Sequence, residues 1–113
     1  MAYQPAYERF EVAGRDARRR AVEFEKAGFL AVGDQPELYF FRVEGEEVVV
    51  GLSGAALGQL QRKWRYLARE EKIDVAGLFL KRQIEAGQPL VAEKLYIREQ
   101  ELEGLLRELG LRP

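Results

Sequence analysis

The chain has 113 residues, of which 47% are hydrophobic and 33% charged, and its formal net charge at pH 7 is −1. This composition is typical of a single globular domain over residues 1–113. It argues against a disordered chain or a bulk polyanion binder, while a local basic patch stays compatible with it. No stretch approaches the ~18 apolar residues of a membrane-spanning helix. The first residues lack the layout of a secretory signal and there is no cysteine, so we expect a cytoplasmic protein without a membrane partner.

The residue types that the chain lacks bear on catalysis. There is no histidine, cysteine, asparagine or threonine, and Ser53 is the only serine. Nucleophilic catalysis pairs a serine, cysteine or threonine with a base, most often histidine, and zinc, copper and iron sites normally use histidine or cysteine. Carboxylate sites for magnesium or calcium stay possible, as does acid–base chemistry by glutamate, lysine or tyrosine, but the sequence does not group these residues. We therefore expect no catalytic residue, cofactor or metal, and an enzyme is the less favoured class.

The amino-acid composition is biased toward a few residue types, and this bias does not indicate a function. Arginine, glutamate and leucine are abundant, whereas cysteine is absent and methionine occurs once. Thermophile proteins share this bias because they avoid thermolabile side chains and favour ion-pair networks. A GC-rich genome produces much of the same composition.

The first third of the chain is compatible with two structures. Residues 7–12 (YERFEV) have the composition of a short strand. Residues 5–27 have the apolar spacing of one helix face, and opposite charges four residues apart, such as Asp16 and Arg20, support the same helix. Pro5 suits its first turn and Gly28 its end, so we favour a helix over 5–27. The apolar face is formed by Tyr3, Tyr7, Phe10, Gly14, Ala17, Ala21, Phe24 and Gly28.

Residues 38–52 have the pattern of a β-hairpin. A two-residue loop at Glu44–Gly45 would place Arg42 opposite Glu47, where the two side chains form a cross-strand ion pair. Apolar side chains then lie on both faces of the hairpin. We expect both faces to be covered, either by helices of the same chain or by a second subunit. One face carries Tyr39, Phe41, Val48 and Val50, and the other carries Leu38, Phe40 and Val49.

Helical patterns dominate the rest of the chain. Ser53 is placed to cap a helix over 54–71, and Asp74 to cap a second helix over 75–86. Residues 90–97 have strand character, and a last amphipathic helix spans 98–109. The predicted fold class is α+β: a small antiparallel sheet built around the 38–52 β-hairpin and packed by about four helices.

The clearest candidate for a contact surface is a row of cations on the helix over 54–71. We call these residues the basic stripe: Arg62, Arg65, Arg69 and Lys72. None of the three arginines has an acid three or four positions away, so the stripe needs a partner outside its helix. One candidate partner is a nucleic-acid backbone, with Tyr66 stacking at the margin, and another is an acidic protein surface. A structural role is favoured by the near-neutral net charge, with the stripe paired to glutamates of the last helix (Glu99, Glu101, Glu103 and Glu108).

Two further features have structural interpretations. Arg18, Arg19 and Arg20 are expected on a solvated helix face, where acids at helical spacing pair with the last two. Residues 51–54 (GLSG) lie at a strand-to-helix junction of the kind that binds anions. No phosphate-loop lysine follows them, and a helix cap explains the serine.

The composition and the two-faced hairpin lead to a ranked set of functions. The leading expectation is a small non-enzymatic interaction or regulatory protein, acting as a homodimer. The alternative is a nucleic-acid-binding protein that uses the basic stripe. An enzyme with a carboxylate or lysine site comes third.

Overall fold

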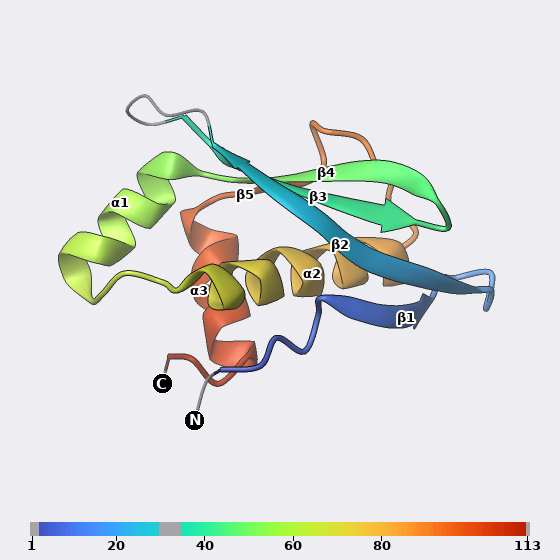
Figure 1. Cartoon of the computed structure of the whole chain (residues 1–113), viewed down its shortest axis with the longest axis horizontal. Coiled ribbons are helices and arrows are strands. Elements are labelled where there is room, and N and C mark those ends of the chain that lie inside the picture. The colour runs from blue at the N-terminus through green and yellow to red at the C-terminus, as the bar shows by residue number, and fades with distance from the viewer. Residues whose placement is uncertain (1–2, 30–34, 113) are drawn as a thin grey trace.

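Five strands and three helices follow one another in the computed structural model, which describes residues 3–29 and 35–112 (Figure 1). The fold class is α+β, as predicted, but these residues form three helices rather than about four. The strands are β1 (Arg9–Ala13), β2 (Arg19–Phe29), β3 (Glu37–Val43), β4 (Glu46–Leu52) and β5 (Tyr96–Ile97), and the helices are α1 (Gly54–Lys63), α2 (Arg69–Glu85) and α3 (Glu99–Glu108).

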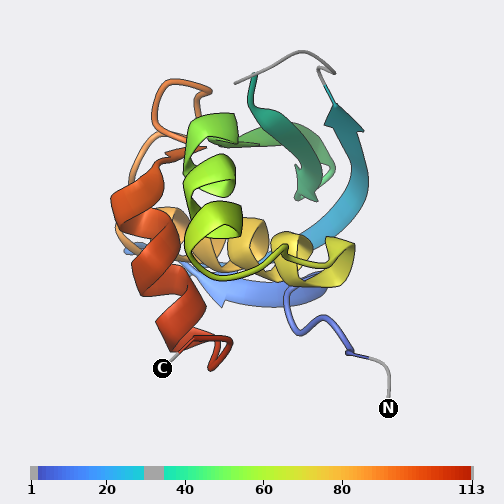
Figure 2. The same cartoon turned by 90° about the vertical axis from the view of Figure 1, so that its left-hand side faces the viewer.

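The strands form one sheet in chain order, β1-β2-β3-β4-β5. Neighbouring strands are antiparallel up to β4, and the short β5 pairs with β4 in parallel. The sheet curls around α2, while α1 and α3 close the side that the sheet leaves open (Figure 2). Helix α2 therefore lies inside the curve, and none of the three described helices covers the outer face of the sheet (Figure 2).

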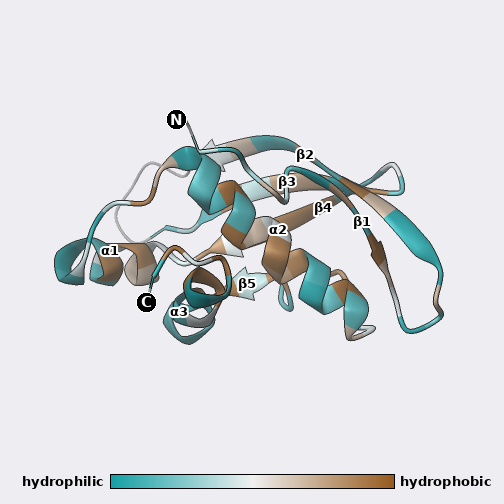
Figure 3. Cartoon of the chain, turned by 90° about the horizontal axis from the view of Figure 1, so that it is seen from below, coloured by the Kyte–Doolittle hydropathy of each residue, from teal (hydrophilic) through white to brown (hydrophobic). Residues whose placement is uncertain are grey.

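Helix α2 is the centre of the fold. Every residue from Ile73 to Leu80 is buried, as expected for a helix that has packed neighbours all round. Figure 3 shows apolar residues on α2 and along β4. The chain before β1 crosses α2 at Gly77, so closely that a Cβ on this glycine would lie 2.5 Å from the Cβ of Tyr7. Only glycine leaves room for that crossing.

The first third of the chain is a pair of strands, so the prediction of a helix over 5–27 is wrong and residues 9–13 are strand. Val12, Val22 and Phe24 are buried. The residues that alternate with them along β1 and β2 point outward, which gives the two-residue period of a strand. A bulge between Phe24 and Lys26 shifts this alternation along β2.

The charges that suggested a helix pair across strands instead. Arg19 bonds Glu11 at 2.9 Å, from β2 to β1. Asp16 and Arg20 do pair at 2.9 Å, as their spacing predicts, but the aspartate lies in the turn between the two strands. A four-residue spacing of opposite charges thus fits a tight turn as well as a helix.

The predicted hairpin register is confirmed in β3 and β4. Phe41 pairs with Val48, and Arg42 lies opposite Glu47. The turn residues Glu44 and Gly45 both have positive φ, as a two-residue hairpin turn requires. Arg42 forms its ion pair with Glu25 of β2, at 2.5 Å, rather than with the residue opposite. The sheet extends well beyond this hairpin, because β2 adds a long strand on one side.

The helix expected over 54–71 is two helices. α1 ends at Lys63, residues 64–68 are not helical, and α2 starts at Arg69. Asp74 is consequently a buried residue within α2 and not a cap. The cap at Ser53 is confirmed, since its Oγ accepts a hydrogen bond of 3.1 Å from the N–H of Ala56.

The C-terminal elements are close to expectation. Of residues 90–97, only Tyr96 and Ile97 form a strand, at the edge of the sheet. The last helix is α3, and its residues Leu102, Leu105 and Leu106 are buried. None of the described helices has the length and apolar character to cross a membrane.

Candidate functional site

The structure separates the residues of the basic stripe. Arg62 lies in the last turn of α1 and Arg65 in the connection to α2. Arg69 is the first residue of α2, and Lys72 follows one turn later. Because the two helices are distinct, the four cations do not share one helix face.

Arg65 helps to start α2. Its guanidinium donates two hydrogen bonds of 2.8 Å to the carboxylate of Glu71, and it lies 4.2 Å from the ring centre of Trp64. The same carboxylate accepts a hydrogen bond of 2.7 Å from the N–H of Ala68, which is the N-cap of α2. The hydrogen bonds from Arg65 hold the pKa of Glu71 below its ordinary value. Arg65 therefore has a structural partner.

The two cations of α2 also contact the chain itself. Lys72 and Glu37 form a largely buried ion pair of 3.1 Å between α2 and β3. Glu37 accepts a hydrogen bond of 2.8 Å from the hydroxyl of Tyr39, whose pKa is raised by burial and then by this bond. Arg69 lies 5.6 Å from the ring centre of Phe24. Arg65 and Lys72 are thus held by carboxylates of the same fold, whereas Arg69 is exposed and forms no described ion pair.

The glutamates of α3 pair with cations outside the basic stripe. Glu99 lies 3.4 Å from Lys63, and Glu103 lies 3.5 Å from Arg112. Glu108 pairs with a residue of α2, Arg82. No described ion pair joins these glutamates to the basic stripe.

Two exposed residues remain near the α1–α2 connection. Arg62 forms no ion pair within residues 3–29 and 35–112. Tyr66 exposes 74% of its surface, the highest value among the exposed large hydrophobic residues of the described chain. Of the predicted contact surface, the structure leaves these two side chains and the exposed Arg69 available.

Asp74 is a buried carboxylate within α2, although its sequence context predicts a helix cap. It is 1% exposed, and it accepts hydrogen bonds from the hydroxyl of Tyr3 and, at 2.8 Å, from the backbone N–H of Tyr7. Partial burial and the bond to Asp74 raise the pKa of Tyr3. Both donors come from the segment before β1, so this carboxylate ties that segment to α2. No local sequence signal identifies partners so distant along the chain.

The described part of the chain has no group of three acidic, histidine or cysteine side chains that could hold a metal ion. Ser53 is buried, and its Oγ is occupied by the cap of α1. Within this part, the geometry therefore brings forward no catalytic or metal-binding constellation.

The outer face of the sheet has a charged half. On β1 and β2 the outward residues form the ion pairs Arg9–Glu23 and Arg19–Glu11, both at 2.9 Å. The ion pair between Arg42 and Glu25 continues this pattern to β3. These exposed pairs keep the charged half well hydrated.

The other half of the outer face is apolar. We call its four half-buried side chains the apolar outer patch: Leu38, Phe40, Val49 and Tyr96. Phe40 lies opposite Val49, and Leu38 opposite a glycine that in turn pairs with Tyr96. The rings lie over glycines, because a Cβ on Gly28 would be 3.3 Å from the Phe40 ring and one on Gly51 would be 2.9 Å from the Tyr96 ring. None of the described helices covers the patch (Figure 1).

Charged side chains of both signs border the apolar outer patch, among them Lys26 and Glu47. Lys26 of β2 lies opposite Phe40, with its Nζ 5.1 Å from the ring centre. Glu47 of β4 lies two residues from Val49, on the same face. Neither side chain takes part in an ion pair among the residues that the structure describes.

Comparisons with known proteins assign this chain to no group. No protein-family model, no curated protein and no solved structure matches it.

Proposed function

We propose that this chain is a non-enzymatic interaction protein, and that the apolar outer patch binds a second copy of the chain. The observation that carries the proposal is the division of the outer face into a paired, charged half and an apolar half. Two sheets pack face to face when the apolar side chains of their facing surfaces interdigitate. A regulatory role would follow from that association.

The charges beside the patch support a second copy as the partner. In a two-fold dimer the same surface meets itself, so it must be self-complementary. Lys26 and Glu47 border the patch with opposite charges and have no ion-pair partner in the described chain. Two copies packed face to face would place the lysine of one near the glutamate of the other. Because the patch is small, we expect a weak dimer.

The experiment is sedimentation velocity over a range of concentrations, with variants of the patch. The native chain should pass from monomer to dimer at micromolar concentrations, and Phe40→Glu should remain monomeric. Ala21→Glu adds the same charge to an exposed position of the charged half and should dimerise like the native chain. A native chain that stays monomeric throughout would contradict the proposal.

Charge reversal provides a test that keeps the apolar surface intact. Lys26→Glu and Glu47→Lys should each weaken the dimer, and the variant with both changes should regain the native affinity. Failure of the double variant to recover would contradict the two-fold arrangement, because the two changes would then act independently.

A second candidate function is nucleic-acid binding at the α1–α2 connection. Its support is the exposed aromatic ring of Tyr66 near Arg62, an exposed cation with no described ion pair. Bases stack on such rings, and cations contact the phosphate backbone. Fluorescence anisotropy with a labelled single-stranded oligonucleotide should show salt-sensitive binding that Arg62→Ala and Tyr66→Ala weaken. Arg107→Ala removes the same charge from the exposed face of α3 and should change nothing. Undetectable binding at low salt would remove this candidate.

A further inference from the structure

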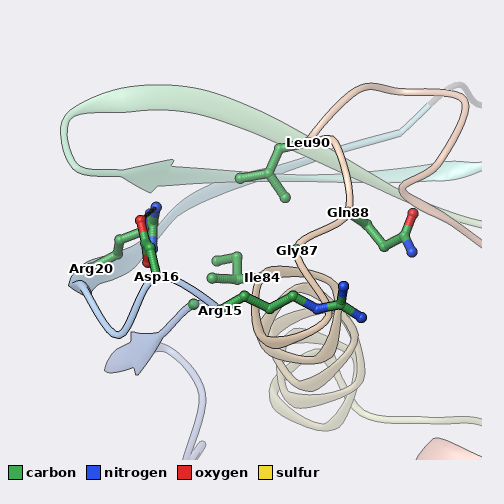
Figure 4. A pocket seen from close by; sticks show the side chains of 8 residues that line it. Arg15, Asp16, Arg20, Ile84, Gly87, Gln88 and Leu90 are labelled. Atoms are coloured by element: carbon green, nitrogen blue, oxygen red, sulfur yellow. Dashed lines mark hydrogen bonds and ion pairs between the residues drawn. The ribbon is translucent and has the colours of Figure 1, made fainter.

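A hollow of about 360 Å³ lies at the end of the curled sheet, between the β1–β2 turn and the C-terminal end of α2 (Figure 4). This volume is at the lower end of the range for small-molecule sites. The lining combines polar and apolar residues from three segments of the chain: Gly14, Arg15, Asp16, Arg20, Ile84, Gly87, Gln88 and Leu90.

One wall of the hollow is an ion pair held by several hydrogen bonds. Arg20 donates hydrogen bonds of 2.9 and 3.1 Å to the carboxylate of Asp16 and another of 3.1 Å to the carbonyl of Arg18. Asp16 also accepts a hydrogen bond of 3.0 Å from the N–H of Arg18. The side-chain hydrogen bond from Arg20 lowers the pKa of Asp16 to about 2. This wall therefore stays paired and contributes no net charge.

Arg15 supplies a charge without a partner. Its side chain runs past Gly87, where a Cβ on the glycine would be 3.0 Å from the Cδ of the arginine. Its guanidinium has no hydrogen bond or ion pair within residues 3–29 and 35–112. Figure 4 shows it extending along one side of the hollow toward Gln88. The C-terminal end of α2 carries about half a negative charge, which offsets part of the positive charge of Arg15.

The interior of the hollow is apolar. Ile84 is 5% exposed and points into the centre, and Leu90 faces it from the opposite side (Figure 4). An arginine beside two aliphatic side chains matches an anion that is attached to an apolar body. A planar guanidinium binds a carboxylate through two parallel hydrogen bonds.

We propose that this hollow binds a small monocarboxylic acid, whose carboxylate pairs with Arg15 and whose apolar part packs against Ile84 and Leu90. The ion pair of Asp16 and Arg20 serves as a fixed wall. This site is independent of the outer face of the sheet, since no residue of the apolar outer patch lines it.

The test is a titration of the full chain with benzoate and with hexanoate, followed by amide chemical shifts in ¹H–¹⁵N spectra. Saturable shifts should cluster at residues 14–16 and 84–90. Benzamide has the ring without the charge and should bind at least tenfold more weakly. Shifts that do not saturate, or equal binding of benzamide, would overturn the proposal.

Variants test whether Arg15 is the residue that binds the carboxylate. Arg15→Gln should weaken benzoate binding by about ten- to a hundredfold, the effect of losing a charge-assisted hydrogen bond. The matched control is Arg19→Gln, in an exposed ion pair on the outer face, and it should bind like the native chain. Leu90→Ala should weaken hexanoate binding as well. Native affinity in Arg15→Gln, in a chain whose other amide shifts are unchanged, would overturn the proposal. Phe40→Glu separates the two proposals, because it should abolish the dimer and leave benzoate binding unchanged.

Discussion

The carboxylate of Asp74 accepts a hydrogen bond of 2.8 Å from the backbone N–H of Tyr7, across 67 positions of the chain. Because Asp74 lies in the buried middle of α2, this bond ties the segment before β1 to the centre of the fold. Asp74→Ala should lower the free energy of unfolding by about 3 kcal/mol, since hydrogen bonds to a buried charge are lost and a donor is left without a partner. Urea unfolding at pH 7 measures the change.

Tyr3 provides the graded control for this prediction. Its hydroxyl donates to the same carboxylate, but its side chain is 39% exposed. Tyr3→Phe should therefore cost only about 1 kcal/mol. An equal loss in both variants would show that the bond from Tyr7 contributes little.

Gly77 is the position where the segment before β1 crosses α2. Gly77→Ala would gain about 1 kcal/mol in helix propensity if nothing stood in the way. The added Cβ would lie 2.5 Å from the Cβ and 2.6 Å from the carbonyl oxygen of Tyr7. That backbone is fixed by Asp74, so the variant should instead be destabilised by about 1–2 kcal/mol.

A second helical glycine supplies the matched control. A Cβ on Gly104, in α3, would meet no atom within 4 Å. Gly104→Ala should stabilise the chain by about 0.5–1 kcal/mol. Thermal unfolding should show a lower melting temperature for Gly77→Ala and a higher one for Gly104→Ala if the crossing is as close as described. Stabilisation of both would contradict it.

The parts of the fold that the sequence predicts correctly depend on neighbours in the chain. The register of β3 and β4 follows from the turn at Glu44 and Gly45, and the start of α1 follows from Ser53. The same local reasoning fails for residues 5–27. Their apolar spacing suggests one helix, but cross-strand pairs such as Arg19 with Glu11 satisfy the charges in a sheet.

The break between α1 and α2 is not marked by a helix-breaking residue. Residues 64–68 (WRYLA) contain neither glycine nor proline, so helix propensity favours continuation. The break is held by short-range contacts within residues 65–71, in which Glu71 bonds both Arg65 and the N–H of Ala68. For this reason the periodic spacing of the basic stripe predicts one helix, whereas the structure divides the stripe between two. The hollow beside Arg15 was equally invisible, because its lining comes from distant segments.

Ser53 is the predicted N-cap of α1 that the structure confirms. Ser53→Ala removes the acceptor for the N–H of Ala56 and should lower the free energy of unfolding by about 1 kcal/mol. Ser53→Gly should cost only a few tenths of a kcal/mol, because glycine is itself a tolerated N-cap residue. Chemical unfolding of both variants distinguishes a cap from simple loss of packing, for which glycine would be the worse substitution.

Glu71 makes the stability of the fold depend on pH. Hydrogen bonds from Arg65 lower its pKa in the folded chain, whereas an unfolded glutamate titrates near a pKa of about 4.3. The ionised side chain therefore contributes its full stabilisation above that pH, and the contribution is lost as the pH falls through the lower folded pKa. Glu71→Gln should be less stable than the native chain by about 1 kcal/mol at pH 7, and the difference should shrink as the pH approaches 3.

Glu93→Gln, at an exposed residue with no described ion pair, should follow the native curve. Urea unfolding at a series of pH values measures all three chains. A constant difference between Glu71→Gln and the native chain would show that the contact with Arg65 does not depend on the charge of Glu71.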